Sequence, residues 1–445
     1  MTTHNVNIPG SKSIAARALV CRLLGGHDTM LTNLPDCGDT RGMLRLTEAV
    51  RQALATGNPV KVDIGEGGTT LRFGMAACAS IPGLDITLTG SPRLMERPHA
   101  TLVDALRDMG ADITAIPEEN AIHIKGKLLS GGILELDGSV SSQYLSALML
   151  AAPTWQADTR FILKGQVVSR PYIEMTAGVM RAFGADVNIK SEESRVKGQG
   201  SDSNFQFSIF NSQFEVCVRA TGYAQCARYD IEGDWSGASY FFELRLIAEE
   251  LGLELPEFSM PALKSPAESL QGDSRVAAIF AEASRKLAHG RSVATGMDAS
   301  NVQHQTYNLS DAPDLVPAVA VGLCVAGIPF RIEGVGHLRH KESDRMAAIA
   351  TELRRIGYVI ATGDDTMTWD GSRCEPEAEP LIRTYKDHRM AMAFAPAKLA
   401  FPALRIEDPG VVEKSFPDYW LEISKLWKGG FPTPPQAASP LSENL

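Results

Sequence analysis

The chain has 445 residues, too many for one ordinary hydrophobic core, so we expect two sizeable domains. Acidic residues outnumber basic ones by 53 to 43, and the net charge of −10 argues against a general nucleic-acid or membrane-surface binder. The seven cysteines are scattered without a C-x-x-C pair, which indicates neither a disulfide framework nor a zinc site. Because no segment has the apolar length of a membrane span, we expect a soluble, cytoplasmic protein.

The first informative segment is PGSKS (9–13) with Arg17. Apolar spacing predicts a helix over residues 14–24, which puts Lys12 and Ser13 at a helix N-terminus, where backbone N–H groups favour an anion. A phosphate or carboxylate would suit this cluster. An ordinary Ser-capped helix with two solvated cations explains the segment equally well.

A helix, a glycine and a short apolar strand recur along the chain, at residues 102–113, 176–187 and 350–360, with a weaker copy that ends near Gly290. Polar hairpin-like turns occur at 117–120 and 363–365. This pattern predicts an α/β protein built from repeated units. Residues 190–204 are predicted to form a surface loop before the strand-like FQFSIF (205–210).

A second glycine-rich turn, at residues 65–70, opens another helix just before Arg72. It lacks the G-K-[ST] ending of a nucleotide-binding loop, and a tight turn alone would explain it. Arg93 and Arg97 follow in a predicted loop that ends at His99, before a helix that starts near Thr101. Exposed arginines are usually solvated, so this loop is a weak signal by itself.

Two helix starts are rich in hydrogen-bonding side chains, at residues 139–144 (SVSSQY) and 169–172 (SRPY). An N-cap needs one serine, whereas three serines and a glutamine favour a hydroxyl-rich or phosphorylated ligand. Further along, DAPD (311–314) precedes an apolar stretch, where a helix cap alone would explain a carboxylate.

Three later segments carry charge. KESDR (341–345) alternates charges at the start of a helix, which fits either an anion site or a salt-bridged, exposed helix start. DHR (387–389) places an acid, an imidazole and a guanidinium before a wholly apolar helix, a pattern typical of an acid–base and anion site. Lys414 is a single cation in a predicted loop.

Taken together, PGSKS, RP, GSVSSQY, KESDR and DHRMAM in this order resemble the 5-enolpyruvylshikimate-3-phosphate synthase family, over residues 9–420. The resemblance implies an α/β fold, the inside-out α/β barrel of the enolpyruvyl transferases, with two pseudo-threefold domains of repeated βαβαββ units, six in all. It also implies an N-terminal domain over 14–232, mainly on the shikimate-3-phosphate side, and a C-terminal domain over 1–13 and 233–428. Residues 429–445, rich in proline and serine, are expected to form a disordered tail.

The resemblance implies transfer of the enolpyruvyl group of phosphoenolpyruvate to the 5-hydroxyl of shikimate-3-phosphate, with release of phosphate. The expected shikimate-3-phosphate contacts are Ser13, Arg17, Ser141, Ser142, Ser169, Tyr172, Asp314 and Lys341. The expected phosphoenolpyruvate contacts are Lys12, Gly68, Arg97, Gln143, Arg345, Arg389 and Lys414.

Such an addition and elimination needs a base for the hydroxyl and an acid for the methylene carbon. We expect Asp314 to be the base and Glu342 the acid, with Lys12 as the competing acid. His388 and Lys414 would support proton transfer and the leaving phosphate. The resemblance implies no metal and no cofactor, only the two small-molecule substrates as partners, and a monomer that binds neither nucleic acid nor membrane.

Three positions depart from the family pattern. Glu66 stands where the family usually has asparagine, His337 stands where asparagine often contacts the substrate phosphate, and Phe73 replaces a frequent proline. The alternatives are a UDP-N-acetylglucosamine enolpyruvyl transferase, a phosphoryl transferase and a non-catalytic anion-binding paralogue. The reactive-loop cysteine of the first and the nucleotide loop of the second are not recognisable, and loss of Asp314, Glu342 or Lys414 would favour the third.

Overall fold

The computed structural model describes residues 3–138, 141–165, 167, 169–192, 213–290, 304–340 and 343–427. The chain forms two compact units. The C-terminal unit comprises residues 1–12, 33–37 and 232–445, and the N-terminal unit comprises residues 13–32 and 38–231. Within the described ranges, no helix combines the length and the apolar character of a membrane span.

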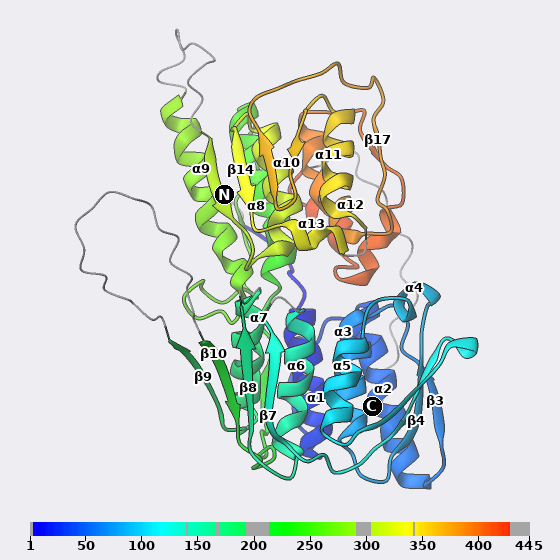
Figure 1. Ribbon diagram of the computed structural model, residues 1–445. Helices are drawn as coiled ribbons and strands as arrows, with labels where there is room; N and C mark the ends of the chain where they lie inside the picture. Colours follow the sequence, from blue (N-terminus) through cyan, green and yellow to red (C-terminus); the bar gives the residue numbers. More distant parts are fainter. Residues whose placement is uncertain are drawn as a thin grey trace, which may run out of the picture. The chain divides into compact units, whose positions relative to one another are not determined.

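The N-terminal unit is built from helices that alternate with strands (Figure 1). Its helices are α1 (Lys12–Gly25), α2 (Gly38–Thr56), α3 (Gly68–Ala79), α4 (Pro92–Met95), α5 (Ala100–Asp108), α6 (Ser142–Ala151) and α7 (Arg170–Ala182). Its strands are β2 (Met30–Thr32), β3 (Val60–Asp63), β4 (Asp85–Thr89), β5 (Asp112–Ile116), β6 (Ala121–Lys125), β7 (Gly132–Asp137), β8 (Thr159–Lys164), β9 (Val187–Glu192), β10 (Gln213–Val218) and β11 (Arg228–Asp230). The first residue of α1, Lys12, is grouped with the C-terminal unit.

Two four-stranded sheets of this unit share one topology, with strand orders β3-β4-β6-β5 and β7-β8-β10-β9. In each sheet the first pair is parallel and the other two pairs are antiparallel. Helix α3 joins β3 to β4 and α6 joins β7 to β8, as parallel neighbours require. One face of each sheet is apolar: in β4, buried Ile86 and Leu88 alternate with partly exposed threonines.

The C-terminal unit has the same mixture of elements. Its helices are α8 (Trp235–Leu251), α9 (Val276–Gly290), α10 (Val316–Val325), α11 (Arg345–Arg355), α12 (His388–Phe394) and α13 (Tyr419–Ser424), with 3₁₀ turns η3 (Gly272–Arg275), η5 (Pro313–Leu315), η6 (Gly336–His340), η7 (Pro396–Leu399) and η8 (Pro409–Lys414). Its strands are β1 (His4–Asn5), β12 (Phe258–Ser259), β13 (Gln305–Asn308), β14 (Phe330–Glu333), β15 (Ala361–Thr362), β16 (Thr366–Trp369), β17 (Leu381–Ile382) and β18 (Arg405–Ile406).

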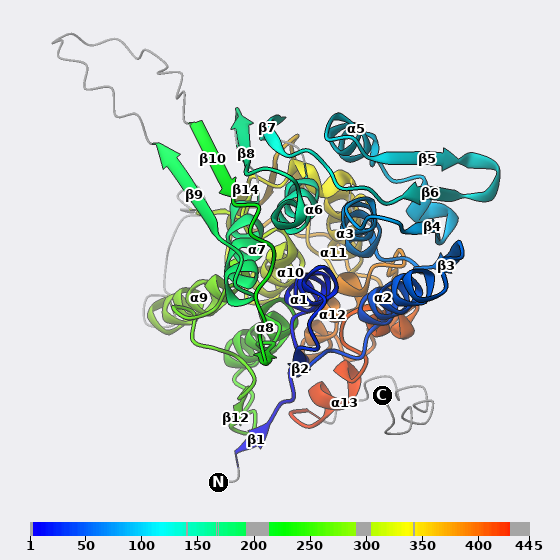
Figure 2. The same cartoon turned by 90° about the horizontal axis from the view of Figure 1, so that it is seen from below.

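The core of this unit surrounds α10, all ten residues of which are buried. Such a helix is apolar on every side because neighbours cover every side, here α8 and α12 among them. The sheet β13-β14-β16-β15 repeats the topology of the two sheets above. The N-terminal strand β1 pairs in parallel with β12, and Figure 2 shows the two side by side.

Local sequence signals predicted several of these elements correctly. The turn at 117–120 joins antiparallel β5 and β6, with Asn120 in the left-handed region at φ 47°. The turn at 363–365 likewise joins β15 and β16. Gly110 (φ 97°) and Gly184 (φ 77°) end their helices before a strand, because only glycine takes this conformation freely.

Two predictions about local structure were wrong. The third repeat has its glycine, Gly357, but β15 starts only at Ala361, because Tyr358 forms a single bridge with Arg373 instead of a strand. The loop predicted to begin at residue 190 begins later, because β9 continues to Glu192 in register with β10. The rest of that loop, the predicted strand 205–210 and the tail 429–445 lie outside the described residues.

Candidate functional sites in the two units

Arg17 organises one group of side chains in the N-terminal unit. The predicted helix is present as α1, and Arg17 is buried one turn after its start. Its guanidinium donates to Thr176 Oγ1 (2.7 Å) and to two carbonyl oxygens, those of Ser13 (2.7 Å) and Tyr172 (3.4 Å). Burial lowers the pKa of Arg17 to about 10, so it remains a cation at neutral pH. Arg17 therefore brings together two residues predicted to contact shikimate-3-phosphate.

The departure at residue 73 belongs to this group. Phe73 is buried in α3, and the guanidinium carbon of Arg17 lies 5.2 Å from the centre of its ring. A buried cation over an aromatic face is an attractive contact, so Phe73 supports Arg17 in a way that proline does not.

A second group in this unit surrounds the start of α3. A β-carbon on Gly68 would lie 2.8 Å from Arg97 Nη1 and 3.0 Å from Arg72 Nη1, so both guanidinium groups approach the backbone here. Arg72 Nη1 also donates to Gln143 Oε1, and Arg72 Nη2 donates to the carbonyl of Pro98 at 3.2 Å. Three residues predicted for phosphoenolpyruvate, Gly68, Arg97 and Gln143, are thus gathered around one buried arginine at a helix N-terminus.

The serine-rich helix starts lie in this unit as well. Ser141 caps α6 by accepting a hydrogen bond from the backbone N–H of Gln143 (3.4 Å), and Ser142 is the first residue of that helix. Ser169 precedes α7 in the left-handed region, with φ 56°, and its carbonyl accepts from the N–H of Tyr172. Ordinary capping therefore explains Ser141 in part, whereas the strained Ser169 is not a side-chain cap.

In the C-terminal unit, Asp314 lies between two guanidinium groups. Its oxygens lie 3.2 Å from Arg345 Nη1 and 2.6 Å from Arg389 Nη2. Arg345 also contacts Asp387, whose Oδ2 is 2.9 Å from Arg345 Nε. Asp314 lies in η5 and caps no helix with its side chain, so the helix-cap alternative for this residue is wrong.

The charged side chains around Asp314 differ in how deeply they are buried. The side chains of Arg345 and Asp387 are 1% and 0% exposed, whereas that of Asp314 is 19% exposed. A buried, fully paired ion pair holds its members in place. Asp314 is the most exposed member of this group.

Two further acids share the electrostatic environment of Arg389. Asp234, the N-cap of α8, accepts from the N–H of Gly237 at 3.1 Å, and burial raises its pKa although Arg389 and Lys12 lower it. Asp273 accepts a hydrogen bond from Ser236, and burial together with the charge of Asp314 raises its pKa to about 7. Burial and the neighbouring negative charge thus both favour the protonated form of Asp273.

The remaining predicted residues of this unit are near these groups or outside the described part of the chain. His388 is buried at the start of α12, 3.8 Å from Asp387 Oδ1, and η8, which ends at Lys414, packs against α12. Lys12 is half-buried. Lys341 and Glu342 lie outside the described residues. Helix α11 begins at Arg345, and Asp344 caps it by accepting from the N–H of Ala347.

Three residues of these groups were not predicted as site residues from the sequence: Arg72, Asp234 and Asp273. Arg72 offered a signal, because it is the only charged residue in the apolar helix α3. The two aspartates offered none, since an acid before a helix is an ordinary cap.

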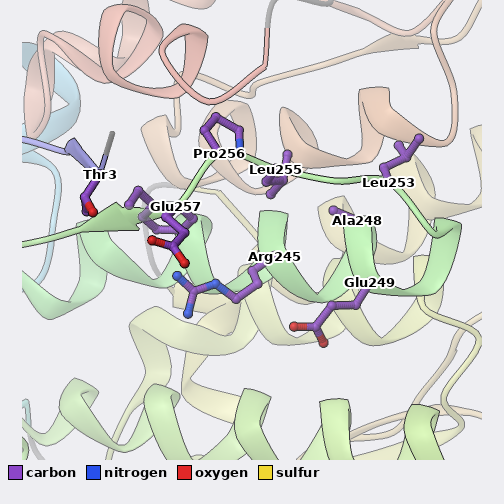
Figure 3. A pocket seen from close by; sticks show the side chains of 9 residues that line it. Thr3, Arg245, Ala248, Glu249, Leu253, Leu255, Pro256 and Glu257 are labelled. Carbon is purple, nitrogen blue, oxygen red and sulfur yellow. The ribbon is translucent and has the colours of Figure 1, made fainter. Parts of the chain in front are cut away.

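A pocket of about 430 Å³ lies elsewhere in the C-terminal unit, between α8 and the segment that leads to β12 (Figure 3). Its lining includes Arg245, whose guanidinium carbon lies 4.4 Å from the ring centre of Phe258. Figure 3 shows the side chains of Arg245 and Glu257 pointing toward one another. None of the predicted substrate residues lines this pocket. Among the described residues, no group of three or more His, Cys, Asp or Glu side chains could hold a metal ion.

Comparison with known proteins gives a consistent answer. A model of the EPSP synthase (3-phosphoshikimate 1-carboxyvinyltransferase) family matches residues 2–423. The chain is 36% identical over 428 residues to the 3-phosphoshikimate 1-carboxyvinyltransferase of Bacteroides fragilis (strain YCH46), covering 95% of each chain. It is 35% identical over 448 residues to the protein of that name from Photobacterium damsela subsp. piscicida, covering 95% of this chain and 96% of the relative.

Solved structures show the fold. An EPSP synthase from Acinetobacter baumannii matches with a TM-score of 0.64 and 19% identity, covering 95% of each chain. The enolpyruvyl transferase NikO from Streptomyces tendae matches with a TM-score of 0.59 and 13% identity, covering 95% of this chain and 94% of NikO. The chain therefore has an α/β fold with mixed sheets and many helices, as these enzymes do.

Proposed function

The chain belongs to the EPSP synthase (3-phosphoshikimate 1-carboxyvinyltransferase) family, and from this premise we propose how its residues carry out the family reaction. It transfers the enolpyruvyl group of phosphoenolpyruvate to the 5-hydroxyl of shikimate-3-phosphate and releases phosphate, a step of the shikimate pathway toward chorismate and the aromatic amino acids. The observation that carries the assignment is the family match over residues 2–423. It does not favour a UDP-N-acetylglucosamine enolpyruvyl transferase.

Phosphoenolpyruvate carries a phosphate and a carboxylate, and guanidinium groups bind both in a planar, charge-assisted manner. We assign its contacts to Lys12, Gly68, Arg97, Gln143, Arg345, Arg389 and Lys414. The convergence of Arg72 and Arg97 on Gly68 supports this assignment on the N-terminal unit. The pair formed by Arg345 and Arg389 supports it on the C-terminal unit.

We assign the shikimate-3-phosphate contacts to Ser13, Arg17, Ser141, Ser142, Ser169, Tyr172, Asp314 and Lys341. The hydrogen bonds of Arg17 to the carbonyls of Ser13 and Tyr172 support the grouping of these three residues. All three nitrogens of Arg17 also donate to protein acceptors, which fixes the orientation of its guanidinium group.

In the proposed chemistry, Asp314 accepts the proton of the 5-hydroxyl while the hydroxyl oxygen bonds to C2 of phosphoenolpyruvate and C3 gains a proton. Glu342, or Lys12 in its place, supplies that proton. In the second step the roles reverse: the group that protonated C3 takes a proton back from C3, the C–O bond to phosphate breaks, and the double bond is regenerated. His388 and Lys414 assist proton transfer and stabilise the leaving phosphate.

The same proposal includes the finer structural expectations. Three described sheets with one shared topology support an inside-out α/β barrel of six βαβαββ units. The two compact units support domains over 14–232 and over 1–13 with 233–428, although residues 33–37 group with the C-terminal unit. We also propose that the protein is a cytoplasmic monomer that needs no cofactor and binds neither nucleic acid nor membrane. All seven cysteines lie within the described ranges, and no disulfide joins any of them.

A direct test is phosphate release from phosphoenolpyruvate, measured with and without shikimate-3-phosphate. The proposal expects release only when both substrates are present, in step with formation of the enolpyruvyl ether. Release without shikimate-3-phosphate would indicate a phosphatase. No release under either condition would favour a non-catalytic paralogue.

A further inference from the structure

The segment between β17 and α12 reaches Asp387 through two consecutive left-handed residues. Tyr385 and Lys386 have φ angles of 54° and 58°. Residues other than glycine rarely adopt this conformation, and it persists only where the surrounding structure holds it. Asp387 follows at once and caps α12, with its Oδ1 accepting from the N–H of Arg389 at 3.0 Å. The direction in which Asp387 and Arg389 point therefore depends on this turn.

Glu352, on α11, holds the turn. Its carboxylate is fully buried, and it accepts hydrogen bonds from the N–H of Arg383 (3.0 Å) and from the hydroxyl of Tyr385 (2.7 Å). Arg355 Nε lies 3.0 Å from Glu352 Oε2 and compensates its charge. Each oxygen of this carboxylate is thus tied to the segment immediately before Asp387.

The same helix also binds the far end of that segment. Arg345 precedes Glu352 by seven residues, so the two side chains lie on one face of α11, about two turns apart. Arg345 pairs with Asp387, and Glu352 binds Arg383 and Tyr385. Helix α11 therefore fixes residues 383–387 at both ends.

We propose that Glu352 is a positioning residue for the transferase reaction. It stabilises the left-handed turn at Tyr385 and Lys386, and this turn orients Asp387 and Arg389 toward Arg345 and Asp314. The inference rests on the proposed roles of Arg345 and Arg389 in binding phosphoenolpyruvate. Glu352 itself acts only through these neighbours.

The test variant is Glu352→Gln, which keeps the size of the side chain but removes its charge and one acceptor oxygen. Since a misplacement of about 1 Å can cost on the order of a hundredfold, we expect kcat/KM for phosphoenolpyruvate to fall by about tenfold to a hundredfold. The KM for shikimate-3-phosphate should change little. Amide hydrogen exchange of the peptide spanning residues 383–392, measured by mass spectrometry on the full chain, should accelerate.

Two further variants separate positioning from general stability. Tyr385→Phe removes a single hydrogen bond. It should lower kcat/KM for phosphoenolpyruvate and accelerate the exchange of residues 383–392, each by less than Glu352→Gln does. Lys386→Asn, at an exposed position, introduces a residue that adopts the left-handed conformation more readily, so it should recover part of the loss in Glu352→Gln. Glu377→Gln is the matched control, because Glu377 is a half-exposed partner of the same Arg355 and makes no contact with the turn.

Unchanged exchange of residues 383–392 in both Glu352→Gln and Tyr385→Phe would overturn the inference, whatever the activity. It would also be overturned if Glu377→Gln lost as much activity, or if Lys386→Asn recovered nothing. If the wild-type protein had no transferase activity, the proposed function would be overturned. Accelerated exchange in Glu352→Gln would then still show that Glu352 stabilises the turn at Tyr385 and Lys386.

Discussion

Asp314 combines two properties at the scale of a single residue. Arg345 and Arg389 hold both of its oxygens, yet it keeps 19% of its side chain exposed. Arg345 also pairs with Asp387, and both side chains are almost fully buried, which holds the guanidinium group beside Asp314 in place. A base must be both oriented and accessible, and Asp314 meets both conditions.

We therefore expect Asp314→Asn to lower kcat by about a hundredfold or more, because the amide keeps the shape but accepts no proton. The KM for shikimate-3-phosphate should change far less than kcat. Steady-state kinetics with Asp344→Asn as the control checks this, since asparagine caps a helix as well as aspartate does. A loss below about tenfold would exclude Asp314 as the general base.

Glu66 poses a separate question, because it adds an exposed carboxylate two residues before Gly68. Arg72, the nearest buried cation on α3, already contacts Gln143 and Pro98. Within the described part of the chain, Glu66 forms no ion pair that would cancel its charge.

Glu66→Asn should therefore lower the KM for phosphoenolpyruvate by roughly two- to fivefold, as expected for removal of one partly screened repulsion. The KM for shikimate-3-phosphate should stay the same. Glu118→Asn, a change of the same charge at another exposed turn, is the control. An equal or higher KM for phosphoenolpyruvate in Glu66→Asn would mean that this carboxylate is structural.

At the scale of elements, the first residue of α3 must be a glycine for Arg72 and Arg97 to approach the backbone there. Gly68→Ala would bring a methyl group to 2.8 Å from Arg97 Nη1 and 3.0 Å from Arg72 Nη1. Both guanidinium groups must then move. Arginine side chains are flexible, so the fold should survive.

We expect Gly68→Ala to raise the KM for phosphoenolpyruvate by about tenfold, the effect of losing roughly one charge-assisted hydrogen bond. Gly38→Ala is the matched control, because Gly38 also begins a helix and has nothing within 4 Å of the added carbon. Kinetics and thermal unfolding of both variants provide the measurement. A wild-type KM in Gly68→Ala would exclude a phosphoenolpyruvate contact at this turn.

The sequence predicted local features such as helix starts, but it did not predict contacts between side chains far apart in the chain. The helix predicted over residues 14–24 is present as Lys12–Gly25, and Gly110 and Gly184 end their helices as predicted, because capping and left-handed glycines depend on adjacent residues. The pairing of Arg72 with Gln143 and of Asp314 with Arg389 joins residues more than 70 positions apart, which no local pattern encodes. The contacts of Arg72 could not be predicted for this reason. The turn that holds Gly68 and the polar run that holds Gln143 were recognised locally, and their substrate roles came from the family resemblance.

At the scale of the whole molecule, one feature of the C-terminal core affects stability rather than catalysis. Glu243 of α8 is fully buried, and neither of its oxygens has a hydrogen-bond partner among the described residues. It packs against Gly322 of α10. A negative charge on Glu243 would raise the pKa of the nearby Tyr419. Burial raises the pKa of Glu243 well above the ordinary value of 4.5, which favours its protonated form in the folded protein.

The sign of the resulting pH dependence follows from linkage. Above pH 4.5 the unfolded chain releases this proton and the folded protein retains it, so folding loses about 1.4 kcal/mol for each pH unit up to the folded pKa. Glu243→Gln removes this titration. Its Tm should therefore exceed that of the wild type by more at pH 8.5 than at pH 5, as measured by thermal unfolding at both values. A Tm difference that does not change with pH would show that Glu243 ionises in the folded protein.

The central claim for the whole molecule is that enolpyruvyl transfer proceeds by addition and elimination, with a proton added to C3 of phosphoenolpyruvate and then lost. Proton NMR of the reaction in D₂O tests this most directly, because C3 becomes a methyl group in the intermediate. The account predicts deuterium at the C3 methylene of the enolpyruvyl product, and it predicts that this label requires both substrates. Formation of product that carries only the original protons would contradict it.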